Sequence, residues 1–151
     1  MTLVMTAADT LHLETVLLGP LEVRAETVIH FAAGLPGFVD RRRFVLVETQ
    51  RDDLIWLQSV DDPTLTFLLS DPFATVPGFE LELPASDLAA LGAAAGGAAS
   101  LLVLAVTQLE RGVPVSANLQ SPIVIDRDRR VGRQVVVPDS VWGMHHPVTI
   151  I

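Results

Sequence analysis

The chain has 151 residues, so we expect residues 1–151 to form a single domain, with residues 1–10 as a flexible N-terminal extension. Half of the residues are hydrophobic and 19% are charged, which excludes wholesale disorder. The net charge of −8 disfavours direct binding of nucleic acid through its phosphates and favours a basic protein partner. The chain has no cysteine, which excludes a thiolate nucleophile and favours a reducing compartment. Since residues 1–18 also lack the basic start of a secretory signal, we expect a cytoplasmic protein.

Short β-rich runs alternate with Gly, Pro and Asp along most of the chain, a pattern typical of antiparallel sandwiches and barrels. The residues between the runs include Gly19-Pro20, Asp62-Pro63 and Asp71-Pro72, where proline and glycine favour turns. The sequence therefore predicts a mainly β protein, a compact antiparallel β-barrel-like single domain. The predicted strands, in chain order, are Leu11–Leu17, Leu21–Val23, Thr27–Phe31, Phe44–Glu48, Ile55–Ser59, Thr66–Leu69, Phe79–Leu83, Leu101–Gln108, Val113–Asn118, Ile123–Asp126 and Gly132–Val137.

One short helix is predicted at Pro84–Leu91, with Asp87 in its first turns and Gly92 where the helix would stop. The uncharged stretch Leu88–Leu109 is long enough to span a membrane, but its first half is rich in Gly and Ala and its apolar second half resembles a buried strand. We therefore predict no membrane segment. The Ala/Gly tract between them is interpreted as a flexible connection.

Several residues are predicted to have structural roles. Gly34-Leu35-Pro36-Gly37-Phe38 predicts a tight turn anchored by Phe38, and the absence of Lys argues against a phosphate loop. Asn118, the only Asn in the chain, precedes Ser121-Pro122 and is expected to satisfy backbone groups at a strand end. Apolar residues of the β-rich runs are expected to fill the barrel core, and these are Trp56, Leu57, Phe67 and Ile123. If Trp56 is fully buried, its truncation to Ala should cost about 3 to 5 kcal/mol.

The charges are distributed unevenly. Ten acidic residues lie between Glu48 and Glu110, where Arg51 is the only basic residue. This asymmetry could attract a basic partner, although charged surface loops are also common in proteins without such a partner. All ten basic residues are Arg, and seven of them form two clusters, Arg41-Arg42-Arg43 and the group Arg127, Arg129, Arg130 and Arg133.

No catalytic or metal site is predicted. The adjacent His145 and His146 would point to opposite faces of a strand, and no serine lies in a nucleophile-elbow motif. We therefore expect no enzyme activity, no metal and no cofactor. The alternative left open by the Arg clusters is a receptor for a cyclic dinucleotide, because forked guanidinium donors suit phosphates. Acidic residues interleave with the second cluster, however, so local ion pairs also explain it.

Four segments together resemble the FliW family of flagellar assembly factors, in family order from about residue 11 to residue 147. They are Phe31-Ala-Ala-Gly-Leu-Pro-Gly-Phe38, Trp56-Leu-Gln-Ser-Val-Asp-Asp-Pro63, Phe67 to Phe73, and Asn118-Leu-Gln-Ser-Pro-Ile-Val-Ile-Asp126 followed by Arg133-Gln-Val-Val136. The chain departs from the family pattern at Ala32, at Asp126, and at Trp142 with His145-His146-Pro147, where the family has Pro, Asn, and Tyr with Arg-His-Pro.

The resemblance implies a non-enzymatic regulator that binds two proteins, the RNA-binding translational repressor CsrA and flagellin. It implies that CsrA bound to the factor cannot repress flagellin mRNA, and that new flagellin displaces CsrA in a chaperone-like exchange. We predict that acidic side chains carry the contact with CsrA, and the expected contributors are Asp61, Asp62, Asp71, and Glu80 or Glu82. For Asp61 and Asp71, turn capping before a proline is an equally strong interpretation.

Overall fold

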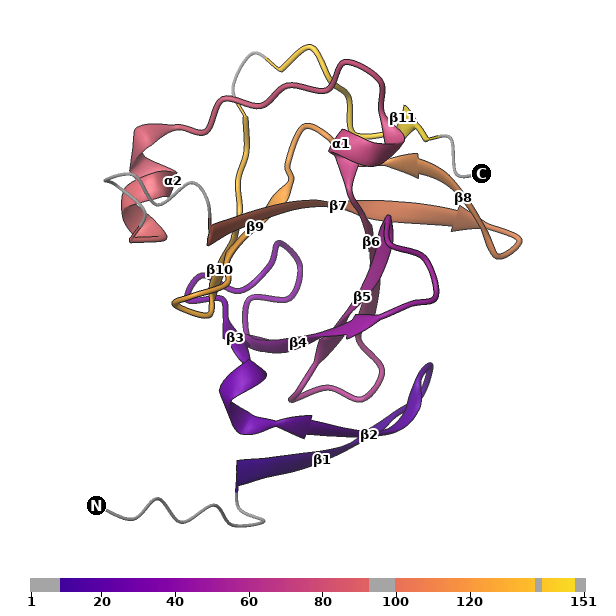
Figure 1. Ribbon diagram of the computed structural model, residues 1–151, viewed down its shortest axis with the longest axis vertical. Coiled ribbons are helices and arrows are strands. Elements are labelled where there is room, and N and C mark those ends of the chain that lie inside the picture. The colour runs from indigo at the N-terminus through magenta and orange to yellow at the C-terminus, as the bar shows by residue number, and fades with distance from the viewer. Residues whose placement is uncertain (1–8, 93–99, 138–139, 149–151) are drawn as a thin grey trace.

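The computed structural model describes residues 9–92, 100–137 and 140–148, and within them the chain is mostly strand (Figure 1). The strands are β1 (Thr10–Thr15), β2 (Gly19–Arg24), β3 (Ile29–His30), β4 (Arg43–Glu48), β5 (Leu54–Ser59), β6 (Thr66–Ser70), β7 (Leu101–Glu110), β8 (Val113–Ala117), β9 (Ile123–Asp126), β10 (Val131–Gln134) and β11 (His146–Pro147). The helical segments are the 3-10 turn η2 (Ala25–Thr27), α1 (Pro72–Thr75) and α2 (Ala85–Ala90). The predicted flexible extension at residues 1–10 falls mostly outside the described residues, which begin at Asp9.

Nine strands form one sheet that curls into a barrel-like ring (Figure 1). Their order is β11-β8-β7-β6-β5-β4-β3-β10-β9, and β9 also pairs with β7. The ring therefore runs from β7 through β6, β5, β4, β3 and β10 to β9, while β8 and β11 continue the sheet on the other side of β7. All of these pairings are antiparallel except that of β3 with β10, which is parallel and joins His30 to Val131. The predicted mainly β, barrel-like fold is therefore confirmed, with one parallel pairing that the sequence did not indicate.

The first two strands form a separate hairpin, drawn in indigo beneath the ring in Figure 1. Its apolar side chains alternate with exposed ones, so that Leu11 and Leu13 are half-buried while His12 and Glu14 face solvent. The backbone N–H of Val16, at the hairpin tip, donates to the carbonyl of Pro63 at 3.0 Å. This bond ties the hairpin to the loop between β5 and β6.

The main hydrophobic core fills the ring and draws side chains from most of its strands. It includes Phe31, Phe44, Leu57, Leu69 and Ile123, all fully buried. Phe31 packs edge-to-face on Phe44, with ring centroids 5.3 Å apart. Two smaller clusters lie outside the ring, one around Phe79 and Leu119 and one around Leu91 and Val135. These clusters hold the α1–α2 segment and the C-terminal segment against the sheet.

Three of the four residues expected in the core pack in or against the main cluster. Leu57 and Ile123 are fully buried, and Phe67 is partly buried against the main cluster. Trp56, by contrast, is half-buried and belongs to none of the three clusters, so it does not fill the barrel core as the sequence predicted. It alternates with Leu57 along β5 and therefore lies on the outer face, paired with Val47 and Leu68.

Three other predictions about elements need correction. Phe79–Leu83 is not a strand, although its alternation of buried and exposed residues is as predicted. Phe79 and Leu81 pack into the second cluster and Leu83 into the third, so the pattern reflects packing against the sheet rather than pairing within it. The helix predicted at Pro84–Leu91 is present as α2, but α1 is a second helix, since Asp71-Pro72 opens a helical turn. The short strand β11 was also missed.

Candidate functional site

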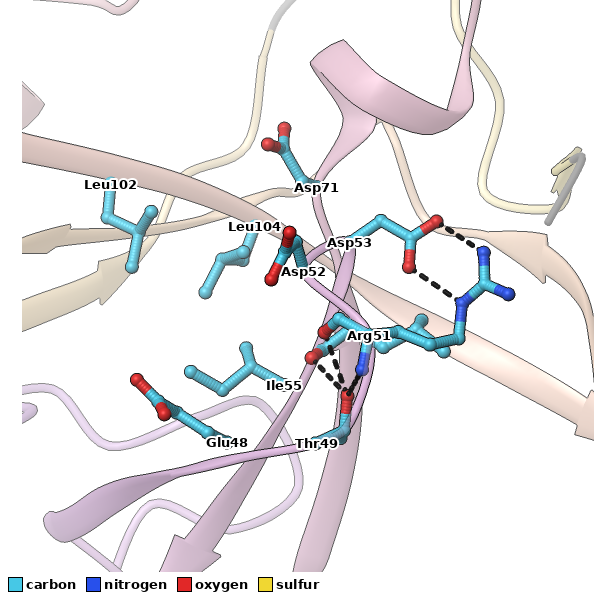
Figure 2. A pocket seen from close by; sticks show the side chains of 10 residues that line it. Glu48, Thr49, Arg51, Asp52, Asp53, Ile55, Asp71, Leu102 and Leu104 are labelled. Carbon is cyan, nitrogen blue, oxygen red and sulfur yellow. Dashed lines mark hydrogen bonds and ion pairs between the residues drawn. The ribbon is translucent and has the colours of Figure 1, made fainter. Parts of the chain in front are cut away.

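Part of the acidic middle segment surrounds a pocket of about 220 Å³ at one end of the barrel (Figure 2). The turn between β4 and β5 forms one wall, Asp71 at the end of β6 forms another, and apolar side chains of β5 and β7 form the floor. Figure 2 shows the carboxylates of Glu48, Asp52 and Asp71 around the hollow. The floor side chains are Ile55, Leu102 and Leu104.

Local hydrogen bonds fix the wall of the pocket that the β4–β5 turn forms. The hydroxyl of Thr49 donates to the carbonyl of Leu54 at 2.8 Å and accepts from the backbone N–H of Arg51 at 3.0 Å, which closes the β4–β5 turn. The antiparallel register of β5 and β6 then places Ser70 opposite Leu54. As a result the backbone N–H of Asp71 donates to the carbonyl of Asp53 at 3.0 Å, and residues far apart in sequence meet at the pocket.

One acidic side chain of the pocket is neutralised and three are not. The guanidinium of Arg51 donates to both carboxylate oxygens of Asp53, at 2.9 and 2.8 Å. These hydrogen bonds hold the pKa of Asp53 below its usual range and raise the pKa of Arg51. Glu48, Asp52 and Asp71 make no ion pair with any residue in the described ranges. The pocket therefore presents net negative charge over an apolar floor.

Asp71 also stabilises α1. It is the N-cap residue of that helix, and its Oδ1 accepts the backbone N–H of Phe73 at 3.0 Å. An N-cap aspartate satisfies one of the backbone donors that the first helical turn leaves unpaired. The capping interpretation of Asp71 and its position in the acidic pocket are compatible, because the cap uses one of its carboxylate oxygens.

Asp61 and Asp62 lie at the other end of β5, in the turn before β6, and both are engaged with arginines. Asp61 is ion-paired with Arg43, and Asp62 accepts from Nε of Arg41 at 3.2 Å. The hydroxyl and backbone N–H of Thr64, at 2.6 and 3.0 Å, lower the pKa of Asp62 most, and Arg41 adds to the effect. The six residues of β5 separate this turn from the pocket by about 20 Å. The structure therefore does not bring Asp61 and Asp62 together with Asp71.

Glu80 and Glu82 occupy a third place, on the extended segment between α1 and α2. Both are exposed, and the carbonyl of Glu80 accepts the indole N–H of Trp142 at 3.2 Å. The five acidic residues predicted from the sequence thus fall into three separate locations. Glu48 and Asp52 were not predicted as contacts. One sequence feature could have indicated them. The adjacent Asp52 and Asp53 lie between two predicted strands, and the next predicted strand, Thr66–Leu69, ends just before Asp71.

The predicted structural residues form tight local contacts. Gly34 has φ +63°, and a Cβ there would lie 2.6 Å from Cα of Val39. The backbone N–H of Phe38 donates to the carbonyl of Leu35 at 2.7 Å and closes the turn around Pro36 and Gly37. The ring of Phe38 is half-exposed and contacts Phe67 edge-on, with centroids 5.7 Å apart. The turn is therefore anchored on the rim of the core.

Asn118 makes a contact of the predicted kind. Its Oδ1 accepts the backbone N–H of Ser121 at 3.1 Å, just beyond the end of β8. Pro122 is buried, and its carbonyl accepts the backbone N–H of Val135 at 2.8 Å. Together these contacts lead the chain from β8 into the buried strand β9.

The arginine clusters are largely used within the protein. Besides Arg41 and Arg43, Arg133 of β10 donates to Asp87 of α2 at 2.6 Å, a bond that joins the helix to the barrel. Asp126 is buried, and its Oδ1 accepts the backbone N–H groups of Asp128 and Arg129 in the β9–β10 turn. Internal pairing therefore accounts for several guanidinium groups that a cyclic dinucleotide would need.

Neither a metal-binding group nor a membrane-spanning helix is found among the described residues. They contain no group of three or more His, Asp or Glu side chains arranged to hold a metal ion. None of their helices is long and apolar enough to cross a membrane.

Comparison with known proteins gives one consistent family. The model of the family described as FliW protein matches residues 12–148. The flagellar assembly factor FliW of Geobacillus kaustophilus is 34% identical over 128 residues, covering 85% of this chain and 88% of that protein. The flagellar assembly factor FliW of Treponema denticola is 31% identical over 139 residues, covering 91% and 93%.

A solved structure agrees with these relatives. The crystal structure of a flagellar assembly factor FliW superimposes with a TM-score of 0.82 and 29% sequence identity, covering 90% of this chain and 95% of the other. The same barrel-like fold is therefore found in a protein whose sequence is related along nearly its whole length. From the family match, the relatives and the shared fold together, this chain belongs to the FliW family of flagellar assembly factors.

Proposed function

We propose that this chain binds CsrA through the acidic pocket and so relieves the repression of flagellin mRNA by CsrA. Family membership supports a role in flagellar assembly. The observation that carries the choice of surface is the group of three carboxylates around an apolar floor, none of which forms an ion pair with a described residue. A protein that binds RNA presents basic side chains to the phosphates, and such a surface is complementary to this pocket.

The proposed mechanism is electrostatic. Bound beside the RNA-binding surface of CsrA, the carboxylates of Glu48, Asp52 and Asp71 oppose the phosphate attraction that dominates protein–RNA affinity. The chain itself makes no base-specific contact with RNA. Flagellin reverses the inhibition by occupying this protein, through apolar as well as charged contacts, and so frees CsrA.

The contribution of the other predicted acidic residues follows from their pairing. Asp61 and Asp62 already interact with arginines, so their charges contribute less to the field around the molecule. Glu80 and Glu82 are unpaired within the described residues and add to the negative potential. We therefore expect the pocket carboxylates to dominate association with CsrA, with Asp61 and Asp62 contributing least.

The first experiment measures the kinetics of CsrA association over a series of salt concentrations. Glu48→Gln/Asp52→Asn should slow association about tenfold at low salt and reduce its salt dependence. Asp61→Asn/Asp62→Asn is the matched control, because it removes the same formal charge from the paired turn. Equal effects of the two double variants would contradict the assignment of the pocket, and no binding of CsrA by the wild-type protein would refute the proposed function.

A second experiment tests the order of exchange. A labelled flagellin mRNA leader is mixed with CsrA, then with this protein and then with flagellin, while bound RNA is followed. RNA should be released at the second step and rebound at the third. Binding of RNA by this chain alone at physiological salt would refute the mechanism, as would a stable complex of all three proteins with RNA still excluded.

A further inference from the structure

A row of four rings lies on the outside of the barrel, apart from the acidic pocket. Phe73 of α1 contacts Phe79 edge-on with centroids 5.0 Å apart, and Phe79 contacts Trp142 at 5.4 Å. Trp142 in turn contacts His146 of β11 edge-on at 5.3 Å. The row thus joins α1, the extended segment after it and the C-terminal segment. Figure 1 shows α1 and β11 on the same side of the ring.

One end of this row and the residue beside Trp142 are open to solvent, whereas Phe79 is buried and Trp142 and His146 are half-buried. Phe73 is 58% exposed, and Val141, next to Trp142, is 90% exposed. Beside them lies a hollow of about 320 Å³ lined by Gly78, Glu80, Leu81, Glu82, Val141 and Trp142. Exposed aromatic and aliphatic side chains around a hollow are typical of protein-binding surfaces, and Trp is among the residues that most often dominate their affinity.

The surface is held in a fixed shape. The indole N–H of Trp142 donates to the carbonyl of Glu80, and the backbone N–H of Leu119 donates to the carbonyl of Gly143 at 3.0 Å. The backbone N–H of Trp142 also donates to the hydroxyl of Ser140 at 3.1 Å. A surface that is already ordered loses little conformational entropy on binding.

The rim of the hollow is acidic. Glu80 and Glu82 are exposed, and neither makes an ion pair with a residue in the described part of the chain. Because their segment alternates, Leu81 lies between them on the side packed against the second cluster. A partner that covers Trp142 and Val141 would therefore meet two carboxylates at the edge.

We propose that this surface, formed by Phe73, Glu80, Glu82, Val141 and Trp142, is a second protein-binding site that takes an amphipathic segment with apolar and basic side chains. The apolar face of the segment covers Trp142 and Val141, and its Lys or Arg side chains reach Glu80 and Glu82. The inference goes beyond the proposed function and does not depend on the protein bound at the acidic pocket.

The fluorescence of Trp142 can report binding at this surface. The chain has two Trp residues, so Trp56→Phe leaves Trp142 as the only one. The probe is a synthetic amphipathic helix of Leu and Lys, which has no Trp. Its binding should shift the emission of Trp142 to shorter wavelength, since the half-exposed indole becomes buried. Titration without any change in that emission would overturn the proposal.

Calorimetry with the same peptide tests the individual side chains. Val141→Ser and Glu80→Lys/Glu82→Lys should each weaken binding about tenfold or more. The controls are Val16→Ser, an equally isolated change at an exposed valine, and Glu14→Lys/Glu22→Lys, which changes net charge equally on the β1–β2 hairpin. Val141 is exposed and Glu80 and Glu82 face solvent, so none of these variants removes core packing. Equal losses in the test and control variants would show non-specific attraction and refute the site, whereas failure of CsrA binding would refute only the proposed function.

Discussion

Gly132→Ala should destabilise the barrel strongly, because the ring of Phe31 occupies the space that a side chain would need. A Cβ at Gly132 would lie 2.4 Å from Cζ and 2.7 Å from Cε2 of Phe31. Carbon atoms in van der Waals contact are about 3.5 to 4.0 Å apart, so the ring or the strand must move by more than about 1 Å. The substitution therefore tests whether close packing of Phe31 on β10 is essential.

The neighbours of Phe31 determine how much stability the Gly132→Ala substitution removes. The ring is fully buried and packs edge-on against Phe44, which is also fully buried, so it has no solvent-filled space to enter. Overpacking of a well-packed core costs about 1 to 3 kcal/mol, and we expect the upper end, about 3 kcal/mol. For a chain of this length that loss corresponds to a fall in melting temperature of about 6 to 12 °C.

Thermal unfolding followed by circular dichroism measures this change. Gly143→Ala is the matched control, because a Cβ at Gly143 would meet nothing closer than the backbone nitrogen of His145 at 3.9 Å. Phe31→Leu combined with Gly132→Ala should lose less stability than the two single variants added together, because the smaller side chain relieves the overlap. A melting temperature of Gly132→Ala equal to that of Gly143→Ala would refute the reasoning.

Three further predictions concern single polar contacts. Asp71→Ala should lower the free energy of unfolding by about 1 kcal/mol, because α1 loses its N-cap. Asp71→Asn should keep the cap and remove only the charge, so urea unfolding should show little change for that variant. Asp87→Asn or Arg133→Gln should each lower the free energy of unfolding in urea by about 1 kcal/mol and raise the rate of amide exchange in α2. Equal exchange rates in the wild type and both variants would contradict the idea that the Asp87–Arg133 ion pair anchors α2 to the barrel. Thr64→Val should raise the depressed pKa of Asp62 in an NMR titration, because the largest cause of the depression is the Thr64 hydroxyl. Since that pKa is lowered by folding, the stabilisation from Asp62 is present above its unfolded pKa and is lost as pH falls through the folded pKa, and an unchanged titration in the variant would contradict the assigned cause.

The strands were predictable from sequence where an apolar, β-rich run lies between turn-forming residues. The hairpin of β4 and β5 is an example, because both runs are rich in β-branched and aromatic residues and a polar turn separates them. The two-residue strand β11 has no such pattern, since His146 and Pro147 become a strand only by pairing with β8. Phe79–Leu83 shows the opposite failure, because alternation also arises where an extended segment packs on a sheet without pairing.

The candidate site was predictable only in its overall charge. The sequence shows that the middle of the chain is acidic, but it does not show which carboxylates meet an arginine. Asp61 and Asp62 are paired because β4 places Arg43 beside the β5–β6 turn, and Asp71 reaches the β4–β5 turn because β5 and β6 are in register there. Both outcomes depend on strand register, which is set by packing of the whole sheet. The helix α1, in contrast, has a local signal in Asp71-Pro72, an N-cap residue followed by proline.

The ring of strands is not equally strong around its circumference. β5 is joined to each neighbour by five cross-strand pairs, whereas β3 and β10 meet only at His30 and Val131. Few backbone hydrogen bonds therefore resist separation of β3 from β10. Packing of the Phe31 ring against the backbone of Gly132 also holds this part of the ring together. The barrel thus has a seam, and a local opening that begins there would expose the core before the hairpins of β4, β5 and β6 lose their hydrogen bonds.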